Sequence, residues 1–96
     1  MKAFIVHRWD GTPVSDWYPW LRKQLEKDGF NVVVPEMPNT AVPTIDSWVG
    51  HLQSVCRDVD QQTYFVGHSI GCQAILRYLT TLPEDVCIGD IILVAG

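Results

Sequence analysis

The chain has 96 residues, of which 47% are hydrophobic and 19% charged, a size and composition that fit one folded domain and exclude intrinsic disorder. No apolar run approaches the roughly 18 residues that a membrane-spanning helix needs, so we expect no membrane association. Seven Lys and Arg against eleven Asp and Glu leave a net charge of −4 with no basic cluster, which argues against nucleic-acid binding.

The cysteine pattern argues against disulfides and metal binding. Cys56, Cys72 and Cys87 form no CxxC pair and accompany no paired histidine motif, so we expect no disulfide framework, no zinc site and no other metal or cofactor. Three unpaired thiols fit a reducing cytoplasm best. Residues 1–7 contain too few apolar side chains for a signal peptide and are expected to begin the fold instead.

The N-terminal part of the chain predicts a strand followed by a helix. Residues 3–6 are an uninterrupted apolar run, as expected of a strand buried on both faces. A helix is predicted over residues 16–28, with Ser15 or Asp16 as its N-cap and Gly29 at its end. Its apolar side, expected to face a sheet, comprises Trp17, Trp20, Leu21 and Leu25.

Strands and helices continue to alternate through the rest of the chain. Residues 30–34 predict a second strand, followed by a proline-rich loop and a helix that Thr44 caps. The apolar residues of this helix recur at spacings of three and four: Ile45, Trp48, Val49, Leu52, Val55 and Cys56. Residues 63–66 predict a third strand, residues 70–82 a third helix, and residues 91–95 a fourth, buried strand.

This alternation predicts a single α/β domain, with a four-stranded parallel sheet and three helices distributed over both faces. The common doubly wound arrangement gives the strand order 2-1-3-4. In such sheets ligands bind beyond the carboxyl ends of strands 1 and 3, where the winding reverses. We therefore expect the chemistry to be concentrated in the loops after these two strands.

A Gly-His-Ser-Ile-Gly motif, residues 67–71, lies between the third strand and the third helix. A G-x-S-x-G motif in this setting is typical of a nucleophile elbow, a tight turn that presents a serine to a pocket. Gly67 and Gly71 leave room for the neighbouring strand and helix, and His68 stands just before the serine. We predict Ser69 to be a nucleophile; the alternative is a glycine-rich turn with an incidental serine.

A serine that accepts acyl groups needs hydrogen-bond donors for the oxyanion. They are normally the backbone N–H after the nucleophile and one N–H from the loop after the first of these strands. In this chain Ile70 provides the first and, by position, Trp9 the second. Both are expected at the switch point of the sheet, close to Ser69.

Several segments accompany the elbow motif. They are Phe4-Ile5-Val6-His7, Trp17-Tyr18-Pro19-Trp20-Leu21, Met37-Pro38-Asn39 with Trp48, Gly67-His68-Ser69-Ile70-Gly71-Cys72 with Ala74-Ile75-Leu76-Arg77-Tyr78-Leu79, and Ile91-Ile92-Leu93-Val94. Together they resemble the small serine hydrolases of the α/β-hydrolase superfamily, in the family typified by retinoblastoma-binding protein 9 and the bacterial YdeN proteins. The resemblance extends over essentially the whole chain.

The resemblance implies an esterase-like serine hydrolase that forms an acyl-enzyme on Ser69 and acts on a small ester or amide. It also implies an acid and then a histidine after the nucleophile, because α/β-hydrolase triads run in the order Ser, acid, His. The histidines of this chain, His7, His51 and His68, all precede the serine. We therefore expect residues 1–96 to be the N-terminal half of an α/β-hydrolase domain, catalytically incomplete because the triad acid and histidine are missing.

Two features depart from the family pattern. His7-Arg8 follows the first strand where relatives often have His-Gly, so the oxyanion loop is expected to differ in shape. A retinoblastoma-binding Leu-x-Cys-x-Glu motif is absent, so that partner is not expected here.

A second class of function, a non-catalytic α/β interaction module, is the alternative. The predicted strand over residues 91–95 has no later element to cover its outer edge. Unpaired backbone N–H and C=O groups on such an edge favour self-association.

The remaining histidines and tryptophans are expected to be structural. His68, on so tight a turn, is expected to point away from Ser69. His7 is expected to hydrogen-bond within the oxyanion loop, and His51 to be solvated. Trp9 lies in that same loop and is expected to form a pocket wall. The residues expected in the core are Trp17, Trp20, Trp48 and Cys72.

Overall fold

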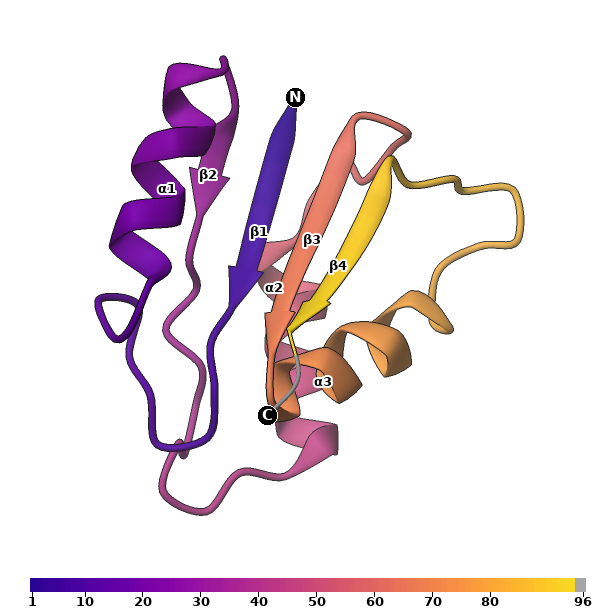
Figure 1. Cartoon of the computed structure of the whole chain (residues 1–96). Helices are drawn as coiled ribbons and strands as arrows, with labels where there is room; N and C mark the ends of the chain where they lie inside the picture. The colour runs from indigo at the N-terminus through magenta and orange to yellow at the C-terminus, as the bar shows by residue number, and fades with distance from the viewer. Residues whose placement is uncertain (95–96) are drawn as a thin grey trace.

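A four-stranded parallel sheet forms the centre of the molecule, as seen in a computed structural model that describes residues 1–94. Its strands are β1 (Lys2–Val6), β2 (Asn31–Val33), β3 (Thr63–His68) and β4 (Asp90–Val94). They lie in the order β2-β1-β3-β4, which confirms the predicted topology (Figure 1). Because all strands run the same way, the loops that follow β1 and β3 leave the sheet at the same end.

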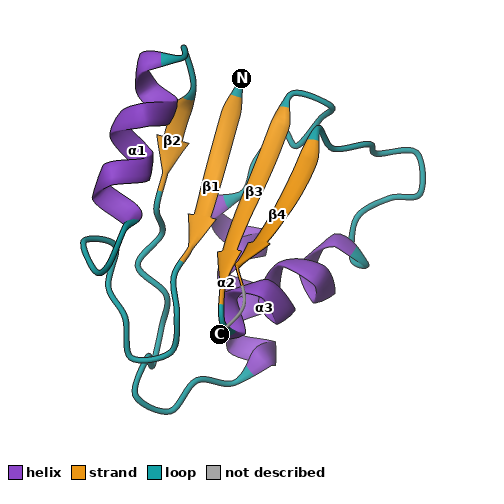
Figure 2. Ribbon diagram, in the orientation of Figure 1, coloured by secondary structure: helices purple, strands orange, loops and turns teal. Residues whose placement is uncertain are grey.

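Three helices, α1 (Tyr18–Lys27), α2 (Ile45–Val55) and α3 (Ile70–Leu79), cover the two faces of the sheet (Figure 2). Successive side chains of a strand point to opposite faces, and two separate cores follow from this alternation. On one face α1 packs on side chains that include Ala3, Ile5 and Val66. On the other face α2 and α3 pack on a core that includes Phe4, Val6, Trp48, Leu52, Phe65, Ala74, Ile75 and Tyr78.

The start of α1 differs from the sequence-based expectation. Neither Ser15 nor Asp16 caps this helix; Trp17 precedes its first residue and makes no side-chain capping bond. The Ser15 hydroxyl instead accepts the backbone N–H of Thr12, and the Asp16 carboxylate binds the Arg8 side chain. Both predicted caps are therefore used to hold the loop that follows β1.

Trp20 was wrongly assigned to the core. Its side chain is 64% exposed, whereas Tyr18, which the pattern omitted, is fully buried. Tyr18, Leu21 and Leu25 are spaced by three and four residues and form the sheet-facing stripe of α1, in which the two leucines are partly buried. At about 100° per residue Trp20 lies roughly 200° from Tyr18, on the opposite side of the helix. The assignment of Trp17 and Trp48 to packed positions is confirmed.

The other helix caps and helix ends agree better with the predictions from the sequence. Gly29 ends α1 with a φ of 89°, a conformation that glycine adopts at little cost. Thr44 caps α2, because its hydroxyl accepts the backbone N–H of Ser47. The third helix ends at Leu79, three residues earlier than expected. Over residues 1–94 we found no helix with the length and apolar character needed to cross a membrane.

The fourth strand forms where predicted but is not buried. Ile92 and Leu93 are 59% and 47% exposed, since β4 lies at an edge of the sheet. The final residue of the predicted strand, Ala95, lies outside the described part of the chain. One side of β4 and the exposed part of α1 border an apolar groove lined by Trp17, Trp20, Leu21, Leu25, Val66, Ile92 and Val94.

Candidate active site

Ser69 occupies a sharp turn between a strand and a helix. β3 ends at His68 and α3 begins at Ile70, so Ser69 alone makes the turn. Its φ of 58° and ψ of −124° lie in a region that non-glycine residues adopt at a cost of about 1–3 kcal/mol. The turn is held by the Ser69 N–H, which donates to Val94 O at 3.2 Å, and by Ser69 O, which accepts the Cys72 N–H at 3.0 Å.

The two glycines of the motif permit this turn to pack against its neighbours. A Cβ on Gly67 would lie 2.9 Å from Cys72 Cα. A Cβ on Gly71 would overlap Val6 O and lie 2.9 Å from His7 O. The first turn of α3 therefore touches the backbone at the carboxyl end of β1, and the elbow lies beside the loop that follows that strand.

The loop after β1 is fixed by the buried side chain of His7. Its Nδ1 donates to Arg8 O at 3.0 Å, and its Nε2 accepts the backbone N–H of Met37 at 3.1 Å. Desolvation by burial lowers the pKa of His7, although the bond to the Arg8 carbonyl opposes this shift. The imidazole is thus a neutral structural link between two loops, in agreement with the expected hydrogen bonding of His7.

Most backbone N–H groups of this loop already have acceptors. Arg8 N–H donates to the Tyr18 hydroxyl at 2.8 Å, and Asp10 N–H donates to Thr40 O at 2.8 Å. In contrast, the N–H groups of Trp9 and Ile70 donate to no acceptor within residues 1–94. The two N–H groups that the sequence analysis singled out thus have no hydrogen-bond acceptor among the described residues.

The Trp9 side chain lies on the surface of the same loop. Its ring is 57% exposed, and its Nε1 donates to Ala41 O at 3.0 Å. This bond ties the loop after β1 to the proline-rich loop between β2 and α2. Trp48 Nε1 fixes the latter loop further by donating to Pro38 O at 2.7 Å.

His68 binds residues of α1 and its preceding turn. Its Nδ1 lies 2.8 Å from the Tyr18 hydroxyl and 3.9 Å from Asp16 Oδ2, and its ring packs against Trp17 at a centroid distance of 5.2 Å. No hydrogen bond joins Ser69 Oγ to a histidine within residues 1–94. Sequence reasoning missed Tyr18 as a site residue, because its partner His68 lies 50 residues away in the chain.

Cys72, three residues after the serine, is half-buried rather than fully buried as expected. Its thiol donates to Val94 O at 3.4 Å. Desolvation raises the pKa of this thiol. A protonated thiol is a weak nucleophile, so this pKa shift gives no support for Cys72 as a nucleophile.

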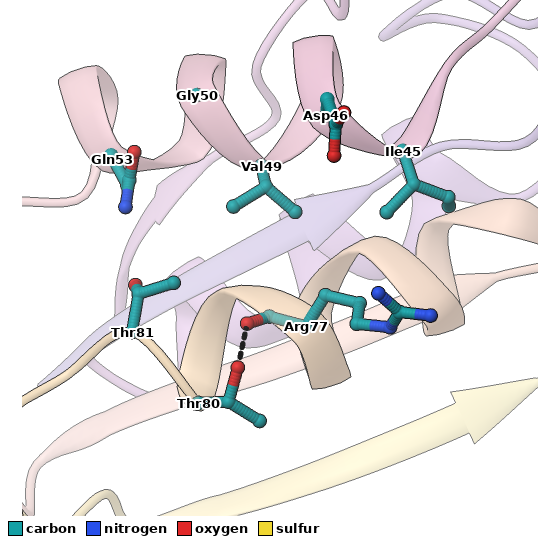
Figure 3. A pocket seen from close by; sticks show the side chains of 8 residues that line it. All are labelled: Ile45, Asp46, Val49, Gly50, Gln53, Arg77, Thr80 and Thr81. Carbon is teal, nitrogen blue, oxygen red and sulfur yellow. Dashed lines mark hydrogen bonds between the residues drawn. The ribbon is translucent and has the colours of Figure 1, made fainter.

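A separate groove of about 240 Å³ lies between α2 and α3. It is lined by Ile45, Asp46, Val49, Gly50, Gln53, Arg77, Thr80 and Thr81 (Figure 3). None of the predicted site residues lines it. Within the described 94 residues there is also no group of three or more His, Cys, Asp or Glu side chains arranged to hold a metal ion.

Comparison with known protein families shows to which family this chain belongs. The family described as serine hydrolase matches residues 3–96. The chain belongs to this serine hydrolase family. It is 37% identical to the YdeN protein of Bacillus subtilis (strain 168) over 95 residues, which cover 99% of this chain and 50% of YdeN. It is 34% identical over 83 residues to the serine hydrolase RBBP9 of Rattus norvegicus, covering 83% of this chain and 44% of RBBP9.

Solved structures of this hydrolase fold agree with the topology. The crystal structure of the B. subtilis ydeN gene product superposes with a TM-score of 0.90 at 36% identity, covering 96% of this chain and 50% of that one. An extracellular α/β-hydrolase from a Paenibacillus species superposes with a TM-score of 0.68 at 20% identity, covering 97% and 39% of the two chains. The second similarity supports the α/β-hydrolase fold alone. The chain spans about half the length of the curated relatives that it matches.

Proposed function

We propose that this chain carries the nucleophile and the oxyanion-binding groups of an esterase-like serine hydrolase. Ser69 is the nucleophile, and the backbone N–H groups of Ile70 and Trp9 stabilise the oxyanion. The general base and its acid come from sequence outside residues 1–96. The substrate class is a small ester or amide.

In the proposed reaction Ser69 Oγ attacks the carbonyl carbon of the substrate while the base takes the hydroxyl proton. The carbonyl oxygen becomes an oxyanion that accepts hydrogen bonds from Trp9 and Ile70. When the tetrahedral intermediate collapses, the alcohol or amine leaves with the proton from the base, and an acyl-enzyme remains on Ser69. A water molecule then attacks the acyl-enzyme while the base takes its proton. The carboxylic acid is released, and the base returns the proton to Ser69 Oγ.

The observation that carries this proposal is the left-handed backbone of Ser69. Strained φ and ψ values at a non-glycine residue persist only where the surroundings impose them, and they cluster at functional sites. The adjacent N–H groups without acceptors and the membership of the serine hydrolase family add support. A glycine-rich turn with an incidental serine would have no reason to retain such strain.

A fluorophosphonate probe tests the proposal because it reacts with activated serines. In the complete protein that carries this chain, we expect the adduct on the tryptic peptide that contains Ser69, detected by mass spectrometry. The peptide that contains Ser54, an exposed serine of α2, is the internal control and should remain unlabelled. Equal labelling of both peptides, or labelling of neither, would contradict the assignment of Ser69 as an activated nucleophile.

The exposed edge strand β4 favours the second candidate function, self-association of this chain. Ile92 and Leu93 expose large apolar side chains on a strand whose outer edge has no partner within residues 1–94. A second copy of the chain would cover this edge and the apolar side chains beside it.

If the chain associates through β4, the double substitution Ile92→Lys and Val94→Lys should raise the solubility of the 96-residue chain and convert it to a monomer. Both side chains line the apolar groove beside α1, so charges there would oppose association. Sedimentation velocity at tens of micromolar, roughly the range in which such edges associate, would show the change. A wild-type chain that sediments as a stable monomer would refute self-association through β4.

A further inference from the structure

Tyr18 connects the two loops of the candidate site through one buried hydroxyl. The residue is the first of α1 and is fully buried. Its hydroxyl oxygen accepts the backbone N–H of Arg8 at 2.8 Å and lies 2.8 Å from Nδ1 of His68. The hydroxyl has one proton and two lone pairs, so it bonds to both groups at once, and the tautomer of His68 decides which atom donates in the second bond. The loop after β1 is thereby joined to the residue that precedes the nucleophile.

The Tyr18 hydroxyl is suited to joining Arg8 and His68. Desolvation raises the pKa of Tyr18, so the group stays protonated and able to donate. A buried hydroxyl without partners would be costly, whereas this one has two hydrogen-bond partners, Arg8 and His68. The two bonds, to Arg8 and to His68, therefore fix the position of the Tyr18 hydroxyl.

We propose that Tyr18 is a positioning residue for the oxyanion hole, a role that rests on the proposed function of Ser69. The Tyr18 hydroxyl takes the N–H of Arg8, and the next N–H along the loop, that of Trp9, is left without an acceptor in residues 1–94. The same hydroxyl holds His68, whose backbone leads directly into Ser69. One side chain thus fixes the distance between an oxyanion donor and the nucleophile.

A second contact from the same segment supports this arrangement. Asp16 Oδ2 lies 2.6 Å from Arg8 Nε and 3.9 Å from His68 Nδ1, so it approaches the same two residues as Tyr18. The ion pair is partly exposed and is expected to contribute little on its own. The buried hydroxyl of Tyr18 is the stronger of the two links.

The test is the kinetics of Tyr18→Phe in the complete protein, with p-nitrophenyl acetate as substrate. Loss of the hydroxyl should lower kcat by about tenfold or more and leave KM unchanged, because an oxyanion donor acts in the transition state and small misplacements are costly. Tyr64→Phe is the matched control. Tyr64 packs on the same face of the sheet, against Phe30, and its hydroxyl makes no hydrogen bond within residues 1–94. Its kcat should equal that of the wild type.

A second pair of variants covers the case in which Tyr18→Phe does not fold. His68→Asn retains a hydrogen-bonding group near the place of Nδ1, whereas His68→Leu removes it, so kcat should fall several-fold more in the leucine variant. Equal kcat in Tyr18→Phe and Tyr64→Phe, or in the two His68 variants, would overturn the positioning role while Ser69-dependent turnover persisted. Turnover that survives Ser69→Ala would instead overturn the proposed function itself.

Discussion

Ser69→Ala in the complete protein should lower kcat for p-nitrophenyl acetate by about 10⁴-fold or more, because removal of the nucleophile from a serine hydrolase abolishes the acyl-enzyme route. Residual hydrolysis would come from binding and from the oxyanion donors alone. Circular dichroism should show an unchanged fold, since the substitution removes one hydroxyl that has no hydrogen-bond partner within residues 1–94.

The same substitution in the isolated 96-residue chain should change nothing. Within the described residues no histidine makes a hydrogen bond to Ser69 Oγ: His7 is bonded to Arg8 and Met37, and His68 to Tyr18. A serine hydroxyl without a base is a weak nucleophile, so the chain and its variant should hydrolyse the ester equally slowly. A Ser69-dependent rate in the isolated chain would mean that a base exists within these 96 residues.

Gly71→Ala is expected to destabilise the fold by about 3 kcal/mol, at the upper end of the cost of overpacking. The added methyl would overlap the backbone carbonyl of Val6 and approach that of His7. Neither carbonyl can move away as a flexible side chain would, so α3 must shift and the elbow with it. Urea unfolding of the 96-residue chain would measure the loss.

Gly50→Ala is the matched control, because Gly50 lies in the middle of α2 and a Cβ there would meet nothing within 4 Å. This substitution should stabilise the chain by up to about 1 kcal/mol, since alanine favours a helix interior over glycine. We therefore expect the free energy of unfolding to fall in Gly71→Ala and to rise in Gly50→Ala. A neutral Gly71→Ala would contradict the close packing of the elbow against β1.

The sequence allowed prediction of the element types, the strand order and the position of the elbow. These features depend on local patterns: apolar runs for β1 and β3, spacings of three and four for α2, and the two glycines around Ser69. Each pattern is contained in a few consecutive residues. The structure confirms the strand order and places Ser69 alone between β3 and α3.

The errors arose where distant residues decide the outcome. Tyr18 forms a hydrogen bond with His68, 50 residues later in the chain, and with Tyr18 on the sheet side of α1 the side chain of Trp20 faces solvent. Asp16 resembles a helix cap in sequence but binds Arg8 on the preceding loop. The edge position of β4 follows from the predicted strand order, but its apolar run predicts burial, whereas Ile92 and Leu93 are exposed.

The central claim is that Ser69, Ile70 and Trp9 form one acyl-transfer site. A crystal structure of the complete protein after reaction with the fluorophosphonate probe tests it most directly. The phosphonyl group should be bonded to Ser69 Oγ, with its oxygen about 2.7–3.1 Å from the backbone nitrogens of both Ile70 and Trp9. An adduct on another residue, or a phosphonyl oxygen out of reach of both nitrogens, would contradict the account.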